Sequence, residues 1–410
     1  MSRSAGKPCV IIIVENLPVP LDRRVWQESC ALRDAGYEVV VICPKMRGFM
    51  EAEEVLEGIQ IYRHWISQEA RGILGFLGEY VSALFGEMRL AWKAWWRHRF
   101  GIIHLCNPPD ILFLVALPFK LFGVRIIYDV HDLWPEMFEA KFQKRGLLYR
   151  LVLMAERLTH SCADVVIATN DSVKEVALRR GGKSPDEVFV VRTAPKINVA
   201  NVVANPALKR ERQFLVGYVG VMGNADGVDY ILRAAHHLVH NLNCTSVQFL
   251  LMGSGPEFDS LLRLREQLCV TDYVEMPGRV SNDFLFQALQ TMELGVASDP
   301  QNSYNDHCTM NKVLEYMVFG KAQVMFDLKE GRASAQEAAI YVPDNSAIQL
   351  AEAIWRLLQD GPARERMGRV GLERIQTVLH WDRSVAQLLA AYAKAQNPRS
   401  ARAGSSAVAD

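Results

Sequence analysis

A polar arc on a predicted helix carries the side chains with the clearest chemical potential, Asn311, Lys312 and Glu315. At about 100° per residue these three fall within an arc of roughly 100°. A lysine in the first turn of a helix lies beside the positive end of the helix dipole, so an anion such as phosphate is expected in front of it. Glu315, one turn further on, can accept hydrogen bonds from sugar hydroxyls. Phosphate beside ribose indicates a nucleotide.

The predicted helix starts after Thr309, a suitable N-cap, and ends at Gly320. An ordinary ion pair between Lys312 and Glu315 on the helix surface is the alternative interpretation, and it would contribute roughly a few tenths of a kcal/mol. We favour a ligand site because this helix follows a predicted strand whose neighbours end in glycine-rich turns.

Two such turns follow predicted strands in the second half of the chain. The first contains Gly217, Gly220 and Gly223, and the second spans residues 252–256. Glycines let backbone amides approach a phosphate closely. The spacing G-x-x-G-x-x-G differs from the G-x-G-x-x-G of dinucleotide enzymes, and a tight strand-to-helix connection explains either turn equally well. Together the two turns favour a ligand at one rim.

A third predicted strand in this half is followed by Arg279 and Val280, and then by Ser281 as an N-cap. A guanidinium at the rim suits a diphosphate, because it can donate two parallel hydrogen bonds to it. A solvated surface arginine is the alternative.

In the first half of the chain, His131 closes a buried strand and is followed by Asp132 and Glu136. A histidine at the carboxyl end of a strand can donate to a sugar hydroxyl or stabilise developing charge. A structural histidine bonded to Asp132 or to the backbone is equally compatible with the pattern.

The first predicted helix opens with Asp22 as its N-cap, followed by Arg23 and Arg24. Two cations beside the positive end of the helix dipole hint at a bound anion. A solvated basic turn explains them equally well.

The segment 76–122 places Trp92, Trp95 and Trp96 beside cations such as Lys93. Aromatic and cationic side chains at helical spacing fit a helix that lies on an anionic bilayer surface. Core packing with a basic exposed edge explains them too. The sequence has no D-x-D pair and no His, Cys or Asp cluster with metal spacing, so neither a metal nor a cofactor is predicted.

The composition is that of a globular protein with two domains. The 410 residues include 46 basic and 46 acidic side chains, so nucleic acid is not expected as a main partner. This length exceeds one ordinary core. The eight scattered cysteines look like buried thiols in a reducing compartment. Without a signal peptide or a run of about 20 apolar residues, a cytoplasmic protein is expected.

Apolar runs alternate with helical patterns along the chain, which is typical of βαβ units and a doubly wound α/β fold. Predicted strands cover residues 10–14, 38–43, 102–106, 124–128, 165–168, 188–191, 214–219, 247–252, 273–276, 294–297, 323–326 and 339–342. Predicted helices cover residues 22–35, 72–98, 111–121, 137–160, 172–180, 229–240, 256–268, 283–291, 309–320, 348–359, 363–379 and 382–396.

The alternation restarts near residue 200, so we expect two Rossmann-like domains, 1–200 and 201–380, that face each other across a cleft. The helix at 381–396 is expected to pack back toward the first domain, and residues 397–410 to form a disordered tail. Ligands of such sheets bind outside the carboxyl ends of the strands. Two domains of this kind therefore predict one binding site for each of two substrates.

From about residue 8 to 396 the chain resembles a glycosyltransferase of the GT-B fold, most closely the retaining enzymes of family 4 that build bacterial surface polysaccharides. The matching pieces are Asp22-Arg-Arg-Val-Trp-Gln-Glu28, Asn107-Pro-Pro-Asp110, His131-Asp-Leu-Trp-Pro-Glu136, Gly278-Arg-Val280, Asn311-Lys-Val-Leu-Glu-Tyr-Met317 and Phe326-Asp-Leu328 with Gly331-Arg332. They are specific jointly, and none is specific alone.

The resemblance implies that Glu315 binds the ribose hydroxyls of a nucleotide-sugar and that the backbone at Val280 contacts its base. Asn311 and Lys312 would hold the sugar and the diphosphate of the donor. His131 would line the reacting centre from the first domain. The remaining donor-side candidates are Gly220, Gly223 and Arg279, and the acceptor-side candidates are Arg23, Asp132 and Glu136.

The family retains the anomeric configuration of the transferred sugar and needs no metal. The donor is a nucleotide diphosphate-sugar, linked to UDP or GDP, and its own phosphate oxygen takes the acceptor proton. Protein groups mainly stabilise the leaving diphosphate.

Three departures from the family pattern stand out. His307 occupies the position of the first glutamate in the family's E-x7-E motif, whose second glutamate is Glu315. Val221 and Asp226 stand where an arginine and a lysine usually follow the first strand of the second domain. No Gly-Gly pair follows Val14.

Losing two cations beside a diphosphate would cost several kcal/mol, since a charged hydrogen bond contributes about 1.5–3 kcal/mol. Lys312, Arg279 or Arg332 would have to compensate. We still expect a cytoplasmic glycosyltransferase, in peripheral contact with the membrane, that acts on a saccharide or lipid-linked saccharide. The alternatives are an inactive GT-B partner or scaffold protein and a GT-B nucleotide-sugar epimerase.

Overall fold

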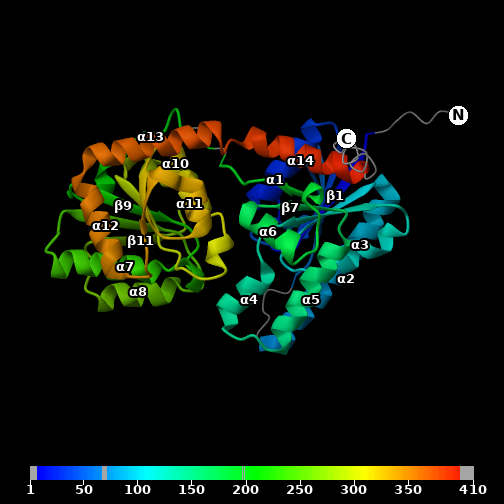
Figure 1. The fold of residues 1–410 in the computed structure, drawn as a ribbon, viewed down its shortest axis with the longest axis horizontal. Helices are drawn as coiled ribbons and strands as arrows, with labels where there is room; N and C mark the ends of the chain where they lie inside the picture. The colour runs from blue at the N-terminus through cyan, green and yellow to red at the C-terminus, as the bar shows by residue number, and fades with distance from the viewer. Residues whose placement is uncertain (1–6, 67–71, 196, 198, 398–410) are drawn as a thin grey trace, which may run out of the picture. The chain divides into compact units, whose positions relative to one another are not determined.

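The computed structural model describes residues 7–66, 72–195, 197 and 199–397. The chain forms two compact units (Figure 1). Unit 1 comprises Met1–Glu139, Gln143–Thr193 and Asp382–Asp410, and unit 2 comprises Ala140–Phe142 and Ala194–Trp381. The chain therefore enters unit 2 a few residues before the predicted boundary at 200. It returns to unit 1 with its last helix.

Unit 1 is built on an eight-stranded sheet in which all neighbouring strands are parallel except one antiparallel pair at the edge. Its strands, from edge to edge, are β3 (Glu53–Leu56), β4 (Ile59–His64), β2 (Glu38–Pro44), β1 (Cys9–Val14), β5 (Ile102–Cys106), β6 (Arg125–Val130), β7 (Val165–Ala168) and β8 (Val188–Val190). Strands β1 and β5 are buried along their whole length. Burial on both faces explains their continuous apolar sequences.

Helices cover this sheet and fill the connections between its strands. They are α1 (Arg23–Asp34), α2 (Gly72–His98), α3 (Phe113–Lys120), α4 (Trp134–Phe142), α5 (Leu147–Cys162), α6 (Asp171–Arg179), the 3-10 turn η1 (Pro185–Glu187) and the C-terminal α14 (Trp381–Gln396). Asp22 caps α1 as predicted, because its Oδ1 accepts from the amide of Val25 at 3.0 Å. None of the described helices is long and apolar enough to cross a membrane.

Unit 2 is built on a six-stranded sheet that is parallel throughout. Its strands, from edge to edge, are β11 (Val274–Gly278), β10 (Val247–Met252), β9 (Phe214–Val219), β12 (Leu294–Ala297), β13 (Ala322–Phe326) and β14 (Ala339–Val342). Because the strands all run in one direction, their carboxyl ends meet at a single rim. This rim is where a ligand of the unit would bind.

The connections of unit 2 contain short turns and longer helices. They are η2 (Pro206–Lys209), η3 (Asn224–Asp226), α7 (Val228–His236), the π-helical turn η4 (His237–Asn241), α8 (Phe258–Gln267), α9 (Asn282–Thr291), η5 (Asn305–His307), α10 (Asn311–Val318), α11 (Lys329–Ala335), η6 (Gln336–Ala338), α12 (Ala347–Gln359) and α13 (Gly361–Thr377).

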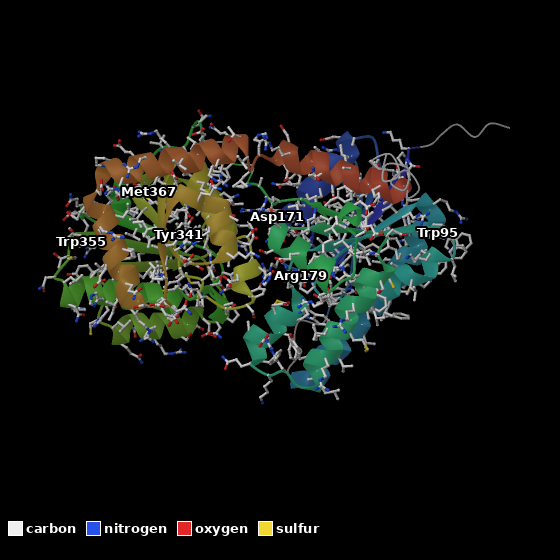
Figure 2. The ribbon with its side chains drawn as sticks, viewed as in Figure 1. Trp95, Asp171, Arg179, Tyr341, Trp355 and Met367 are labelled. Carbon is white, nitrogen blue, oxygen red and sulfur yellow. The ribbon has the colours of Figure 1, made fainter. Side chains whose placement is uncertain are left out.

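Each unit has its own hydrophobic core. Figure 2 marks Trp95, which packs against the core of unit 1, and Trp355 and Met367, which belong to the core region of unit 2. Two separate cores explain why the chain divides into two units. The predicted α/β class with two Rossmann-like domains and closing helices is therefore confirmed.

Side chains of helix α14 form hydrogen bonds with the rest of unit 1. Tyr392 Oη lies 2.8 Å from Nδ1 of His104 on β5, and Ser384 Oγ donates to the carbonyl of Arg192 at 2.7 Å. The ring of Tyr392 also packs edge-on against Tyr37. The helix at the end of the chain thus completes the core of the unit in which the chain begins.

Several predicted elements differ from the observed ones. The single helix predicted at 137–160 is two helices, α4 and α5, because Gln143 adopts a left-handed conformation (φ 50°) that ends α4. Thr309 does not cap α10, which begins at Asn311 after Met310 in an extended conformation. The hairpin β3–β4 and helix α11 were not predicted. The predicted tail lies, from residue 398, outside the described residues.

The eight cysteines are all free thiols. Cys9, Cys43, Cys106 and Cys244 are buried as predicted, whereas Cys269 is exposed. The prediction of buried thiols is therefore wrong for Cys269, which follows the C-terminal end of α8 at the surface.

Candidate functional site

The carboxyl ends of the central strands of unit 2 bring the predicted glycine turns together. The amide of Gly220, after β9, donates to the carbonyl of Met252 at 3.1 Å, and the amide of Gly253, after β10, donates to the carbonyl of Gly278 at 2.9 Å. Three successive strand ends are thus joined by their backbones. Arg279 leaves this rim directly after β11.

The turns approach one another too closely for side chains. A Cβ atom at Gly253 would lie 1.8 Å from the carbonyl oxygen of Gly220. At Gly227, where φ is +60°, a Cβ atom would lie 2.2 Å from the carbonyl oxygen of Ser298. Backbone packing alone therefore requires glycine at both positions. Of the two interpretations that the sequence allowed, this supports a tight connection between strand and helix.

Helix α10 follows β12 and places Lys312 in its first turn, where the ammonium group is almost completely buried (7% exposed). Its Nζ lies 2.7 Å from Oδ1 of Asp299 and 3.6 Å from Oδ1 of Asp226, and 4.9 Å from the centre of the Tyr218 ring. The lysine is therefore not part of a solvated helix surface. Its negative partners in this structure are protein carboxylates.

These contacts decide the charge of the lysine. Burial lowers the pKa of Lys312, but Asp299 and Asp226 outweigh burial, and the pKa is raised. For Asp226 burial dominates and raises the pKa of the carboxyl group, with Lys312 opposing that effect. The lysine stays charged, and the site holds one cation beside two acidic groups.

Asp226 also accepts a hydrogen bond from Gly223, one of the glycines whose backbone was predicted to bind a phosphate. Its Oδ2 accepts from the amide of Gly223 at 3.0 Å, while its Oδ1 faces Lys312. A carboxylate that binds a glycine amide and a lysine together takes the place that the sequence assigned to a donor phosphate. Asp226, noted from the sequence only as an unusual residue, is thus an internal anion of this site. The contact with Lys312 joins η3 to α10 and has no signal in the local sequence.

The other predicted donor-side residues surround this group in different environments. Asn311 is exposed at the start of α10, whereas Glu315 is buried one turn later. Arg279 is exposed, and Val280 packs against the apolar cluster that contains Tyr316. Tyr316 Oη in turn donates to the carbonyl of Val296 at 3.0 Å, which fixes α10 to β12.

Arg332 does not supply a spare cation in this structure. Its Nη2 donates to Oδ2 of Asp327 at 2.7 Å, and the two groups form a paired, solvent-exposed contact after β13. The predicted compensation by Arg332 would therefore require this pair to open.

In unit 1 the central feature is the carboxylate of Asp129, which lies near the carboxyl end of β6 and is completely buried. Arg24 donates to both of its oxygens, at 2.7 and 3.0 Å, and Nε2 of His131 lies 2.8 Å from Oδ2. His104 Nε2 lies 3.5 Å from the same oxygen. Arg24 is thus bound to protein carboxylates, and both earlier readings of it, an anion site and a solvated turn, are wrong.

The network fixes the protonation of His131. Burial lowers its pKa, but Asp129 outweighs burial and raises it. The pKa of Asp129 itself is held well below its usual range, since Arg24 and the histidines overcome the effect of burial. His131 remains 14% exposed. It is the member of this buried network that reaches solvent.

Glu28 completes the network from α1. Its Oε1 lies 3.1 Å from Nη2 of Arg24, and its side chain is completely buried. Burial raises the pKa of Glu28 above its usual range, with Arg24 opposing that effect. Arg24 therefore faces one strongly ionised carboxylate, Asp129, and one that holds its proton to higher pH.

Asn107, after β5, holds the turn that carries His131. Its Oδ1 accepts from the amide of His131 at 2.7 Å, and its Nδ2 donates to Oδ1 of Asp110 at 2.8 Å and to the carbonyl of Asp132 at 2.7 Å. Tyr128 Oη also bonds to Asp110. The segment from Asn107 to Asp110 therefore positions the backbone on both sides of the histidine.

If His131 had a structural role, its predicted partner was Asp132 or the backbone. In the structure the partner of its ring is Asp129.

Glu136 is bound to Arg180 through both carboxylate oxygens, at 2.6 and 2.9 Å, and is buried. It is therefore engaged in packing α4 against α6. Arg23 is exposed in the first turn of α1.

Within the described part of the chain, one group of side chains has the geometry to hold a metal ion, namely His104, Cys106 and Asp129. Sequence spacing does not reveal this group, because His104 and Cys106 alternate on β5 whereas Asp129 lies on β6. Both oxygens of Asp129 already receive hydrogen bonds from Arg24, and Nδ1 of His104 is bonded to Tyr392. A metal ion at this group would therefore compete with Arg24 for the oxygens of Asp129.

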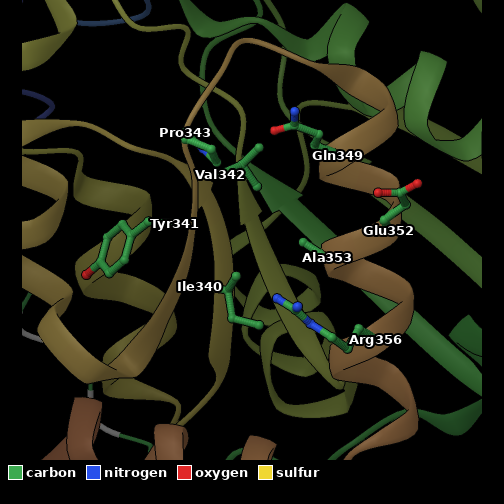
Figure 3. A pocket seen from close by; sticks show the side chains of 8 residues that line it. All are labelled: Ile340, Tyr341, Val342, Pro343, Gln349, Glu352, Ala353 and Arg356. Atoms are coloured by element: carbon green, nitrogen blue, oxygen red, sulfur yellow. The ribbon is translucent and has the colours of Figure 1, made fainter.

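A cavity of about 230 Å³ lies between the edge strand β14 and α12 (Figure 3). Ile340, Glu352 and Arg356 are among its lining side chains, and Arg356 reaches toward Ile340. None of the predicted donor-side residues lines it.

Comparisons with known proteins agree with the fold and with this division into two halves. The model of the Glycosyl transferase 4-like domain matches residues 21–193, and that of Glycosyl transferases group 1 matches residues 213–360. The chain is 27% identical over 223 residues to alpha-D-kanosaminyltransferase from Streptomyces kanamyceticus. That match covers 52% of this chain and 56% of the relative, so it spans little more than half of that protein.

Solved structures resemble the chain over nearly its whole length. Sucrose-phosphate synthase from Thermosynechococcus elongatus has a TM-score of 0.75 at 19% identity, covering 95% of this chain and 99% of that one. HepE from Anabaena, solved in complex with UDP-glucose, has a TM-score of 0.70 at 14% identity, covering 94% and 99%. At these identities the likeness establishes the fold. Together with the two matching family models, it shows that the chain belongs to the GT-B glycosyltransferases.

Proposed function

We propose that this protein is a retaining hexosyltransferase that moves a sugar from a UDP- or GDP-linked donor to a saccharide or lipid-linked saccharide. The placement of Lys312 in the first turn of α10, at the rim where the parallel strands of unit 2 end, is the observation that carries the proposal. HepE, which has the same fold, was solved with UDP-glucose. We assign the product to cell-surface polysaccharide and the reaction to the cytoplasmic face of the membrane.

In this proposal the donor diphosphate replaces the carboxylate of Asp226. Lys312 Nζ and the amide of Gly223, both bound to Asp226 in this structure, then bind phosphate oxygens. Glu315 binds the ribose hydroxyls, and the backbone at Val280 contacts the base. Asn311 and Arg279 complete the donor side. Charge that develops on the leaving diphosphate is stabilised by these donors, so no metal is required.

The reaction proposed is a front-face displacement. The bond between the sugar C1 and the phosphate oxygen breaks, and its electron pair leaves with the diphosphate. The acceptor oxygen forms the new bond to C1 on the same face, and its proton passes to the leaving phosphate oxygen. His131, held by Asp129 and Asn107, stabilises the reacting centre from the acceptor side. Arg23, Asp132 and Glu136 remain the acceptor-side candidates.

The first test is hydrolysis and transfer with a panel of UDP- and GDP-sugars, with Glu315→Ala as the control. The proposal predicts that at least one donor is consumed by the native chain and that the variant loses this activity. A chain that binds and consumes no nucleotide-sugar would contradict it. Conversion of a donor to its epimer without an acceptor would instead establish the epimerase alternative.

A second candidate function is that of an inactive GT-B partner protein. The contact of Asp226 with both Lys312 and Gly223 favours it, because the phosphate donors of the rim are occupied from within. The two candidates differ in one measurable respect. An enzyme must bind a nucleotide diphosphate in competition with Asp226, whereas an inactive partner need not bind one at all.

A further inference from the structure

Helix α5 of unit 1 has an apolar stripe on the side that faces away from the core. Leu147, Leu151, Met154 and Leu158 are between 44% and 74% exposed. At about 100° per residue they fall within an arc of roughly 60°. The buried residues of the same helix, among them Glu156, lie on the opposite side. The helix is therefore apolar on its solvent side, the reverse of an ordinary surface helix.

Helix α3, which packs against both α2 and α5, extends this apolar area. Leu114, Leu117 and Leu121 are exposed at or directly after α3, and Leu121 is 88% exposed. Phe122 is 56% exposed as well, although one side of its ring packs against Trp92 and Trp95. On α2, the side chains of Val81, Phe85 and Trp96 are also exposed, Phe85 by 74%. We call the exposed apolar side chains of these three helices the apolar face.

The aromatic residues noted in the sequence divide between the core and this face. Trp92 and Trp95 pack against Phe119 with ring centres 4.7 and 5.7 Å apart, so they belong to the core of unit 1. Trp96 is exposed and carries the guanidinium of Arg99 over its ring at 4.7 Å. The parts of the apolar face on α2 and α3 therefore lie in the segment 76–122 named from the sequence, whereas the α5 stripe lies outside it.

The exposed charged side chains that flank the α5 stripe are basic. Among the described side chains of α2, α3 and α5, the two carboxylates, Glu87 and Glu156, are buried. The charged side chains outside the core are all basic, namely Arg89, Lys93, Arg97, Lys120, Arg150 and Arg157. Lys93 and Arg97 pair with Glu53 of β3.

Arg150 and Arg157 lie on one side of the α5 stripe, at about 280–300° when Leu147 is set at 0°. Both are exposed, and neither forms an ion pair with any of the described residues. Long basic side chains beside an apolar stripe can extend to the headgroups of a bilayer while the apolar groups insert below them.

A contiguous apolar area is rarely left exposed on a soluble protein without a partner. A protein partner or a second copy of the chain would bury such an area against polar and apolar groups alike. An anionic bilayer satisfies both properties of this surface at once, since its interior takes the apolar side chains and its phosphates take the arginines. The exposed arginines Arg150 and Arg157 beside the α5 stripe therefore favour the bilayer.

We propose that the apolar face of α2, α3 and α5 is a docking surface for an anionic membrane. The proposal makes the membrane contact of the proposed function more specific. Only the biological purpose of the docking rests on that function, because an inactive chain would carry the same surface. It also assigns that contact to residues on α3 and α5. Docking through this face would bring the acceptor-side unit to a lipid-linked substrate.

The test is flotation of the full-length protein with vesicles of phosphatidylglycerol and phosphatidylcholine, and with vesicles of phosphatidylcholine alone. We expect binding to the anionic vesicles, reduced at least tenfold in the double variant Leu151→Asp with Leu158→Asp. The matched control is Ile348→Asp with Val378→Asp, whose parent side chains are similarly exposed in unit 2. The control is expected to bind like the native chain. Circular dichroism and thermal unfolding check that each variant is folded.

A second pair of variants tests the charges. Arg150→Glu with Arg157→Glu should reduce binding at least fivefold, whereas Arg366→Glu with Arg369→Glu, exposed on α13, should not. Equal binding of all variants, or no binding of the native chain to anionic vesicles, would overturn the proposal. Light scattering that shows a native dimer dispersed by the α5 variants would overturn it in favour of a second copy. Sugar transfer to a soluble acceptor is measured separately, so loss of docking and loss of catalysis remain distinguishable.

Discussion

Each unit buries a basic side chain among carboxylates near the ends of its central strands, but the two networks leave different groups for chemistry. In unit 1, Arg24 is enclosed by Asp129 and Glu28, and His131 extends from Asp129 to the surface. In unit 2, Lys312 is itself the buried cation, and Asp299 with Asp226 surrounds it. The first network has a partly exposed histidine at its edge, whereas the second buries its cation between two carboxylates.

The difference lies in what a ligand must do at each site. A substrate can reach His131 without breaking the Arg24–Asp129 pair, because the histidine is a terminal member of that network. In the proposed function, a donor phosphate reaches Lys312 by replacing one of the two carboxylates beside it. Asp226 is the one to be replaced, since it lies 3.6 Å from the ammonium group against 2.7 Å for Asp299, and its pKa is raised by burial.

The largest effect is expected from Lys312→Ala. The substitution leaves Asp299 buried without its cation, and breaking a buried pair in this way costs about 3–5 kcal/mol. It should also abolish nucleotide binding. Chemical unfolding and calorimetric titration measure the two effects separately. Arg332→Ala, which removes an exposed and solvent-screened pair, is the control and should change stability much less. Equal destabilisation by both variants would contradict the assigned network.

The next effect in size is expected from His131→Ala, which should lower kcat about a hundredfold while leaving KM for the donor nearly unchanged. A positioned histidine contributes at least that much when it assists a proton or a developing charge. Steady-state kinetics measure the loss, and His240→Ala, a surface histidine of unit 2, is the control. An unchanged kcat would leave His131 with a structural role only.

The pH dependence follows from the same contacts. A histidine with a raised pKa in the folded state adds stability below its unfolded value of about 6.5, and that stability is lost as pH rises through the folded value. The charged form of His131, and any rate that depends on it, should therefore fall across the same range. Asp129→Asn should move the fall to lower pH, measured by NMR titration of the imidazole.

A smaller effect, opposite in sign, is expected from Asp226→Asn. The substitution removes a negative charge that competes with the donor, so affinity for a nucleotide diphosphate should rise about tenfold, which corresponds to about 1.4 kcal/mol. Asp229→Asn, on the exposed side of α7, is the matched control and should leave affinity unchanged. Weaker binding in the Asp226 variant would show that Asp226 assists the donor.

The smallest effect is expected from Glu28→Gln, and it is an effect on stability. A buried carboxyl group with a raised pKa in the folded state destabilises the fold as pH rises above its unfolded value of about 4.3, because ionisation is easier in the unfolded chain. The variant should therefore be more stable than the native chain at pH 8 and nearly equal at pH 4. Denaturant unfolding at the two pH values measures this. A constant difference would contradict the assignment.

The buried strands could be predicted from the sequence because a parallel strand covered on both faces is a continuous apolar run, as in β1, β5 and β10. The hairpin β3–β4 could not, because Glu53–Leu56 is short and partly exposed and pairs at the edge. The break between α4 and α5 depends on one residue, Gln143, whose left-handed conformation has no strong sequence signal.

At the candidate site, the sequence indicated where a residue lies in its own helix or strand, but not which distant residue it pairs with. Lys312 was recognised from its place in the first helical turn, but its pairing with Asp226 arises from the folding of β9 against β12. Asp129 lies two residues before His131, and an alternating strand places both on one side. That spacing was a signal that could have identified it.

The central claim is that a donor diphosphate replaces Asp226 at Lys312. Calorimetric titration of UDP and GDP into the native chain, Asp226→Asn and Lys312→Ala tests it most directly. The account predicts that the native chain binds one nucleotide, that Asp226→Asn binds it about tenfold more tightly, and that Lys312→Ala does not bind it. Equal affinity in all three proteins, or no binding to any of them, would contradict the account.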